Sequence, residues 1–196
     1  MIPAILMAAG ASLRMGRPKA LLRLGDRSFV RHILETLQRG GIHDVVVVIS
    51  PEADAIREEV DSGGFGRIVM NPRANEGQLS SLIAGLDAID QPGVTAALVS
   101  LVDVPLIDPS TIRLLLTRAA ASPAPILRAV HQGRHGHPVI FKHDLFDALR
   151  RADPAVGAKA VVRTVTIEDV EAGDPGVTDD VDTPEDYARL LRAASR

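Results

Sequence analysis

A loop near the start of the sequence carries residues whose chemistry suits phosphate binding. The segment AAGASLRMGRPKALL, residues 8–22, follows an apolar run. Its first residues are so small that side chains hardly cover the backbone. A ligand can approach such a backbone closely, and successive amide N–H groups form an anion-binding concavity to which cationic side chains add donors. We therefore expect a nucleoside triphosphate here. The small residues are Ala8, Ala9, Gly10 and Ser12, and the cationic ones are Arg14, Arg17 and Lys19.

The spacing of the glycines separates this loop from two better-known phosphate loops. Gly10 and Gly16 have five residues between them. This matches neither the GxGxxG pattern of dinucleotide-binding folds nor the GxxxxGK[ST] pattern of P-loops. The loop is therefore neither of these phosphate loops, and an ordinary glycine-containing loop after a first strand is the alternative to a nucleotide site.

A carboxylate at the end of an apolar strand gives a candidate metal ligand. Asp103 follows the run 96–102 and is itself followed by Val104 and Pro105. Ligands of open α/β sheets bind at the carboxyl ends of the strands. Magnesium takes one or two protein carboxylates and fills its other positions with phosphate oxygens and water. We expect Asp103 to bind Mg²⁺ beside the triphosphate.

Three further carboxylates crowd together near residue 180. With an extended backbone, Asp180 and Asp182 would face one way and Asp179 the other, so the three cannot be equivalent. The residues alone leave open whether Asp180 or Asp182 is the second metal ligand. An alternative is a solvated acidic turn that keeps the start of the next helix negative.

The elements that must position these residues alternate between strand and helix. Val45 to Ile49 is an unbroken β-branched run, typical of a parallel strand buried on both faces. The alternation predicts an α/β fold with right-handed crossovers. The predicted strands are 2–7, 45–49, 67–70, 96–102, 124–130, 137–141 and 164–170; the predicted helices are 28–38, 52–60, 78–89, 110–121, 145–150, 155–162 and one starting at a capping box at Thr183.

Composition limits the class of protein. The 196 residues are 46% hydrophobic, fit one domain spanning residues 1–196, and carry a net charge of −3. That balance gives no reason to expect a nucleic-acid or membrane binder. The absence of cysteine excludes disulfides and thiolate metal sites, and the N-terminal run shows neither a signal peptide nor a span. We expect a cytoplasmic protein.

The loop and five later segments resemble one family. AAGASLRMGRPKALL is similar to the signature of the nucleotidyltransferases related to the molybdenum-cofactor guanylyl- and cytidylyltransferases. NPRANEGQLSSLIAGL, LVSLVDVPLI, GHPVIF, GAKAVV and DVDTPEDY follow in the family's order. The resemblance spans nearly the whole chain. It implies a Rossmann-like three-layer sandwich with a mostly parallel sheet, of the nucleotide-diphospho-sugar transferase type.

The resemblance also implies roles for residues. Asp182 becomes the better second Mg²⁺ ligand, and the stretch containing Gly77, Gln78 and Ser80 meets the base and ribose. The GHPV segment lies near the acceptor, so His137 either contacts an acceptor phosphate or packs. The spacing of His131, His135 and His137 is irregular, which argues against a structural zinc site.

The implied reaction is nucleotidyl transfer from a nucleoside triphosphate to a phosphorylated small molecule. Arg14 and Lys19 would stabilise the developing charge, and a phosphate acceptor needs no general base. Ala9 stands where relatives that use GTP have a second glycine, so the loop is similar to the cytidylyltransferase version and favours CTP and molybdopterin.

Three alternatives remain. The chain could be a guanylyltransferase, or a transferase acting on a sugar phosphate or phospholactate. It could be a non-catalytic accessory protein that hands a cofactor to a molybdoenzyme partner. It could be a dinucleotide-dependent oxidoreductase, which the missing GxGxxG pattern and the cationic loop argue against.

Overall fold

A computed structural model describes residues 1–10 and 15–194 of the chain. A seven-stranded sheet forms its centre, in the order β5-β4-β1-β6-β8-β7-β9. Strands β5, β4, β1 and β6 are parallel, β8 runs antiparallel to both of its neighbours, and β9 is parallel to β7. The strands are β1 Ala4–Met7, β4 Val45–Ile49, β5 Arg67–Met70, β6 Ala96–Leu101, β7 Ile126–His131, β8 Arg134–Lys142 and β9 Ile167–Glu171.

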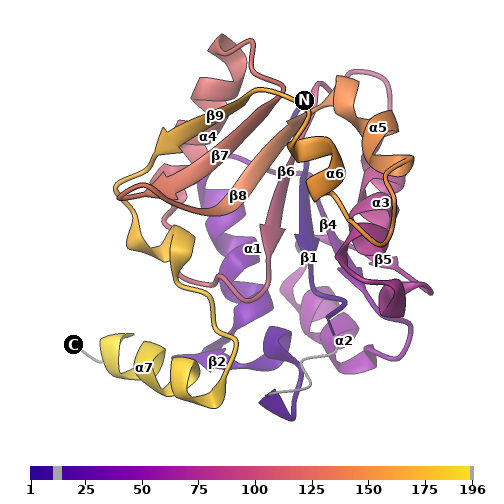
Figure 1. Cartoon of the computed structure of the whole chain (residues 1–196). Coiled ribbons are helices and arrows are strands. Elements are labelled where there is room, and N and C mark those ends of the chain that lie inside the picture. Colours follow the sequence, from indigo (N-terminus) through magenta and orange to yellow (C-terminus); the bar gives the residue numbers. More distant parts are fainter. Residues whose placement is uncertain (11–14, 195–196) are drawn as a thin grey trace.

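Helices cover both faces of this sheet, which confirms the three-layer prediction (Figure 1). One core joins the sheet to α1 Phe29–Arg39, α2 Asp54–Gly63 and α4 Pro109–Ala121. The other joins it to α3 Gln78–Ile89, α5 Phe146–Arg150 and α6 Lys159–Val162. The last helix, α7 Pro184–Ala194, lies beside the short hairpin of β2 Arg23–Leu24 and β3 Arg27–Ser28.

Strand β4 shows why the apolar runs become central strands. Val45, Val47 and Ile49 point into one core, and Val46 and Val48 into the other. All five are buried, so the unbroken run of apolar residues serves two faces at once. The predicted bounds of β4, β5 and α3 agree with the structure.

Helix α3 approaches the sheet very closely at one glycine. A Cβ added to Gly85 would lie 2.5 Å from Cγ2 of Ile5 in β1. No real Cβ atom comes so close, so only glycine allows this packing. The close contact sets the position of α3, whose first residues reach the carboxyl edge of the sheet.

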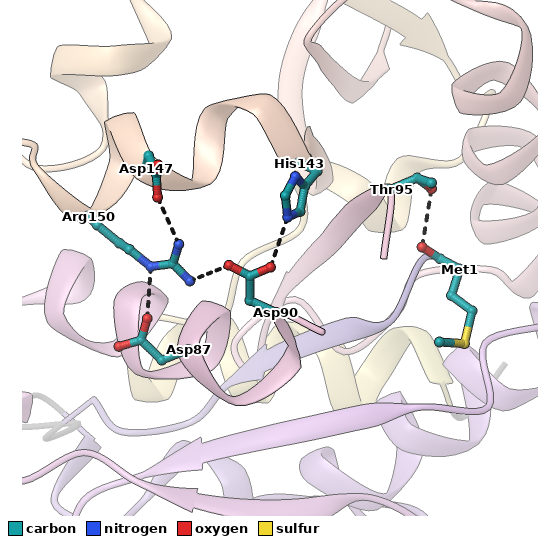
Figure 2. A network of polar contacts seen from close by, with 7 residues as sticks. All are labelled: Met1, Asp87, Asp90, Thr95, His143, Asp147 and Arg150. Carbon is teal, nitrogen blue, oxygen red and sulfur yellow. Dashed lines mark hydrogen bonds and ion pairs between the residues drawn. The ribbon is translucent and has the colours of Figure 1, made fainter. Parts of the chain in front are cut away.

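Arg150 of α5 ties this helix to the C-terminal end of α3 (Figure 2). Its guanidinium donates to Asp87 at 2.8 Å, to Asp90 at 2.7 Å and to Asp147 at 3.1 Å. Asp90 also pairs with Nε2 of His143 at 2.8 Å. Hydrogen bonds from Arg150 and His143 lower the pKa of Asp90, so this carboxylate is charged at neutral pH.

Two predicted elements were wrong in extent. The helix expected over residues 155–162 covers only 159–162, because Asp153 caps a turn and Gly157 adopts a φ of 75°. The loop expected at HQGRHG is mostly strand: β7 ends at His131, β8 begins at Arg134, and only Gln132 and Gly133 form the turn. Within the described ranges, no helix is long and apolar enough to cross a bilayer.

Candidate active site

A cavity of about 460 Å³ opens at the carboxyl ends of the parallel strands β1 and β6. This is the edge at which open α/β sheets bind ligands. The cavity combines a backbone wall with three charged side chains. Its lining includes Ala8, Ala9 and Gly10 after β1, Gly77 and Gln78 at the start of α3, and the side-chain set Lys19, Asp103 and Asp182.

Lys19 contacts both carboxylates directly. Nζ of Lys19 lies 3.1 Å from Oδ2 of Asp103 and 2.5 Å from Oδ1 of Asp182. Only 13% of the lysine side chain is exposed. Burial alone would lower the pKa of Lys19, but the hydrogen bonds and charges of Asp182 and Asp103 outweigh it and raise that pKa. The ammonium is therefore charged and lies between two carboxylates.

Asp103 and Asp182 are brought together by one backbone contact. Asp103 follows β6, and its carbonyl oxygen accepts a hydrogen bond of 2.8 Å from the N–H of Val181. This bond places residue 182 next to the end of β6. Asp180, by contrast, is exposed and does not line the cavity, and the structure therefore favours Asp182 as the second carboxylate.

A capping box at the start of α7 holds Asp182 in place. Oδ2 of Asp186 accepts from the N–H groups of Asp182 at 3.2 Å and Thr183 at 2.9 Å, and Oγ1 of Thr183 accepts from the N–H of Asp186 at 3.2 Å. The predicted capping box is therefore present. No strand forms at residues 179–183, and Asp179 pairs with Arg189.

The donor set fits a divalent cation that also binds phosphate. Oδ1 of Asp103 is buried and has no hydrogen-bond partner among the described residues. A buried carboxylate oxygen without a partner is costly, and a bound cation would remove that cost. No group of three or more His, Asp or Glu side chains that could hold a metal ion occurs in the described part of the chain. Two carboxylates suit Mg²⁺, which completes its shell with phosphate and water oxygens.

The segment before α3 is held by a residue that the sequence did not reveal as important. Asn71 is 1% exposed, and its amide donates to Oγ of Ser80 at 2.9 Å and of Ser81 at 3.0 Å. Ser80 in turn donates to the carbonyls of Arg73 and Gly77. Ser80 was expected to meet the nucleotide; instead its hydroxyl is used to hold the loop, and the neighbouring Ser81 lines the cavity.

Gly77 and Gln78, which were predicted to meet the base and ribose, lie at the start of α3. Gly77 has a φ of 100°, a conformation that favours glycine, and caps the N-terminus of α3. Both residues line the cavity. Their position is compatible with contacts from the backbone and the glutamine amide to a base edge.

The outer end of the phosphate loop is tied to α7. The guanidinium carbon of Arg17 lies 5.4 Å from the ring centroid of Tyr187. The hydroxyl of Tyr187 donates to the carbonyl of Arg23 at 2.7 Å and accepts from the Arg23 N–H at 3.2 Å. Two other predicted residues of this loop, Ser12 and Arg14, lie outside the described residues.

A second cavity, of about 330 Å³, adjoins the first. Both are lined by Met7, Gly77, Gln78 and Leu101, so ligands in the two would meet there. His137 lines this second cavity. Burial lowers the pKa of its imidazole, against the opposing effects of a hydrogen bond with the Val99 backbone and the charge of Asp103. A neutral histidine supplies no charge to a phosphate.

Comparison with known proteins identifies the domain. Residues 4–170 match the family described as the MobA-like NTP transferase domain. This chain belongs to that family. The match runs from β1 to β9 and includes the phosphate loop and Asp103.

Two relatives show the range within the family. The nicotine blue oxidoreductase of Paenarthrobacter nicotinovorans is 33% identical over 199 residues, covering 97% of this chain and 96% of that protein. The molybdenum cofactor guanylyltransferase of Rhizobium johnstonii is 32% identical over 141 residues, covering 70% of this chain and 61% of that protein.

Solved structures share the whole fold. Rv0371c from Mycobacterium tuberculosis superposes with a TM-score of 0.83 at 27% identity, covering 98% of both chains. A second structure of that protein, at 26% identity and with a TM-score of 0.78 over 98% of both chains, is a complex with manganese. A nucleotidyl transfer domain with the nucleotide-diphospho-sugar transferase fold is therefore the framework of this site.

Proposed function

We propose that this MobA-like domain transfers a nucleoside monophosphate, CMP from CTP, to a phosphorylated acceptor, with molybdopterin as the proposed acceptor and Mg²⁺ as the metal. The observation that carries the proposal is the position of Lys19 between Asp103 and Asp182 in the cavity at the sheet edge. A cation and two carboxylates beside a bare backbone are the groups that a metal–triphosphate complex requires.

The chain's own residues mainly bind and orient the reactants. Backbone N–H groups after β1 would hold the triphosphate, and Lys19 would neutralise charge that develops on the phosphates. Asp103 and Asp182 would hold Mg²⁺, which supplies Lewis-acid charge stabilisation when bound. An acceptor phosphate oxygen forms a bond to the α-phosphorus while the bond from that phosphorus to the bridging oxygen breaks, and pyrophosphate leaves. No proton needs to be removed, because the acceptor phosphate is already ionised.

The choice of CTP is based on Ala9. Ala9 lines the cavity next to Gly10, and its methyl group would narrow the space available to a base. A smaller pyrimidine would suit that space better than a purine. The nucleotide is tested by comparing turnover with CTP, GTP and ATP.

The acceptor is proposed from the relatives and from the second cavity. One relative is a molybdenum cofactor guanylyltransferase, and the second cavity opens beside the proposed nucleotide site. The experiment is a pyrophosphate-release screen of each nucleoside triphosphate with molybdopterin, sugar phosphates and phospholactate, with and without Mg²⁺. Pyrophosphate release that depends on CTP, molybdopterin and Mg²⁺ supports the proposal. Release without any acceptor would contradict it.

A second candidate function is an oxidoreductase activity. Its support is the nicotine blue oxidoreductase, which is similar over the full length of this chain. The pair of carboxylates around Lys19 has no evident use in hydride transfer, and this favours the transferase. Oxidation of NADH or NADPH with a dye as electron acceptor tests the alternative. Turnover that persists in Asp103→Asn and without Mg²⁺ would favour the oxidoreductase.

A further inference from the structure

The segment that carries Asp182 has no strand of its own. Residues 172–183 connect the edge strand β9 to α7 and contain a short 3₁₀ helix, Pro175–Thr178 (Figure 1). Asp103, by contrast, directly follows the central strand β6. Because Mg²⁺ tolerates little deviation from octahedral geometry, the position of this segment relative to the end of β6 is important for the proposed metal site.

The carboxylate of Asp174 binds both this segment and the stretch of chain after β6. Its Oδ1 accepts from the N–H of Gly176 at 2.9 Å, within its own segment. Its Oδ2 accepts from the N–H of Asp108 at 2.8 Å and from Oγ1 of Thr111 at 2.7 Å, at the start of α4. The side chain thus joins the segment before α7 to the segment after β6.

Two further contacts hold the same pair of segments together. A Cβ added to Gly176 would lie 2.2 Å from the carbonyl oxygen of Leu106, so the two backbones touch where a larger residue would not fit. The N–H of Val181 donates to the carbonyl oxygen of Asp103 at 2.8 Å. The two segments are therefore held together along their length, from Asp174 to the proposed metal-binding carboxylates.

We propose that Asp174 is a positioning residue for the reaction, and that it sets the distance between the carboxylates of Asp103 and Asp182 by holding their segments together. The inference rests on the proposed function, because it concerns the metal that these two carboxylates would share. Asp174 itself lines neither cavity, so it acts through the two metal ligands. Residues that orient metal ligands commonly affect metal affinity in this way.

The variant Asp174→Asn breaks this link with little change in shape. An amide group has only one oxygen, so it cannot accept at both of the positions that Oδ1 and Oδ2 occupy. Whichever way the amide turns, the N–H of Gly176 or that of Asp108 faces its NH₂ group and loses a hydrogen bond. The two segments then lose part of their connection near the start of α4.

Binding of Mn²⁺ to the full chain without nucleotide, followed by electron paramagnetic resonance, tests the inference. We expect Asp174→Asn to bind Mn²⁺ about tenfold more weakly than the wild type. In the pyrophosphate-release assay, the loss of turnover should shrink as the Mg²⁺ concentration rises, because excess metal fills a weakened site. Wild-type Mn²⁺ affinity in this variant, or a loss of turnover that is the same at every Mg²⁺ concentration, would overturn the inference.

Asp108→Asn is the matched control. It removes the same charge from the same end of α4, but the Asp108 side chain accepts from the N–H and the hydroxyl of Ser110, inside that helix. Asparagine caps helices about as well as aspartate. This variant should therefore bind Mn²⁺ like the wild type. A loss as large as that of Asp174→Asn would assign the effect to charge at the helix start and overturn the inference.

A second pair of variants keeps the test decisive if Asp174→Asn does not fold. Thr111 is 1% exposed, and its hydroxyl donates to Asp174. Thr111→Val keeps the shape and removes this hydrogen bond, whereas Thr111→Ser keeps the bond and removes a methyl group. We expect Mn²⁺ binding to weaken about threefold in Thr111→Val and to stay at the wild-type level in Thr111→Ser. A greater loss in Thr111→Ser would show that only packing matters and would overturn the inference.

The outcomes separate this inference from the proposed function. If Asp103→Asn loses Mn²⁺ binding and Asp174→Asn keeps it, the positioning role is refuted and the metal site stands. If Mn²⁺ binding depends on both residues but no phosphate acceptor releases pyrophosphate from any nucleoside triphosphate, the positioning role stands and the transferase is refuted. Wild-type Mn²⁺ binding in both variants would refute both.

Discussion

Lys19 and Asp182 are 163 residues apart in the sequence and 2.5 Å apart in space. Together with Asp103 they join the loop after β1, the end of β6 and the segment before α7. In the absence of other cations, the ammonium pairs with both carboxylates but balances only one of their two negative charges. A bound metal ion and triphosphate would add their own charges at this same position.

Asp103→Asn should lower nucleotidyl transfer by roughly 10²-fold to 10³-fold, the usual cost of losing an electrostatic group in such a site. The fold should persist, because the hydrogen bond from the Val181 N–H to the carbonyl oxygen of residue 103 does not involve the side chain. Pyrophosphate release measures the loss. Asp180→Asn is the matched control, since Asp180 lies outside the cavity, and it should keep wild-type turnover.

Lys19→Met should separate the two roles of the lysine. Turnover should fall, because the phosphates lose a cation. Binding of Mn²⁺ without nucleotide, followed by electron paramagnetic resonance, should tighten, because the carboxylates of Asp103 and Asp182 lose their internal counter-ion. Weaker Mn²⁺ binding in this variant would mean that the carboxylates are not the metal ligands.

Tyr187 is expected to position the phosphate loop. Tyr187→Phe keeps the ring beside Arg17 and Phe29 but loses the two hydrogen bonds with the Arg23 backbone. Tyr187→Leu loses the aromatic ring as well as the two hydrogen bonds. We expect the KM for the nucleoside triphosphate to rise in the order wild type, Phe, Leu, with a smaller effect on kcat. A purely structural residue would lower the melting temperature and leave the KM of the remaining folded enzyme unchanged.

His137 should make the protein sensitive to acid. Its pKa is lower in the folded protein than the usual value of 6.5, so the unfolded chain binds the proton more readily. The stability of the folded state is therefore lost as pH falls below 6.5. Burial has the same effect on His32. His137→Gln should flatten the fall in melting temperature between pH 6.5 and 5, with the difference between wild type and variant at pH 8 as reference. An unchanged slope would contradict this assignment.

The sequence predicts local features of this fold well. Runs such as Val45 to Ile49 can be recognised as central strands from the sequence, because a strand buried on both faces needs apolar residues at every position. The helix predicted over 110–121 is α4, which begins at Pro109 after Asp108, whose side chain accepts from the Ser110 N–H at 2.7 Å. Each of these patterns is formed by residues that are close together in the sequence and belong to the element that they predict.

Features made by distant residues were not visible. The hydrogen bond that Ser80 accepts comes from Asn71, and the backbone of Arg23 is hydrogen-bonded to Tyr187 in α7. Lys159 lines the second cavity from the first position of α6, after a turn where a helix was predicted. No local pattern encodes these contacts, because each depends on how α3, α6 and α7 pack in the finished fold.

The backbone bond between Val181 and Asp103 also has a consequence for the order in which the site is made. During synthesis, Lys19 and Asp103 leave the ribosome well before Asp182, and domains begin to fold from their N-terminal part. The strands of the sheet, up to Glu171 in β9, precede Asp182 in the chain. A nascent chain can therefore assemble its sheet while the carboxylate pair is still incomplete, and nucleotide chemistry begins only after the sheet exists.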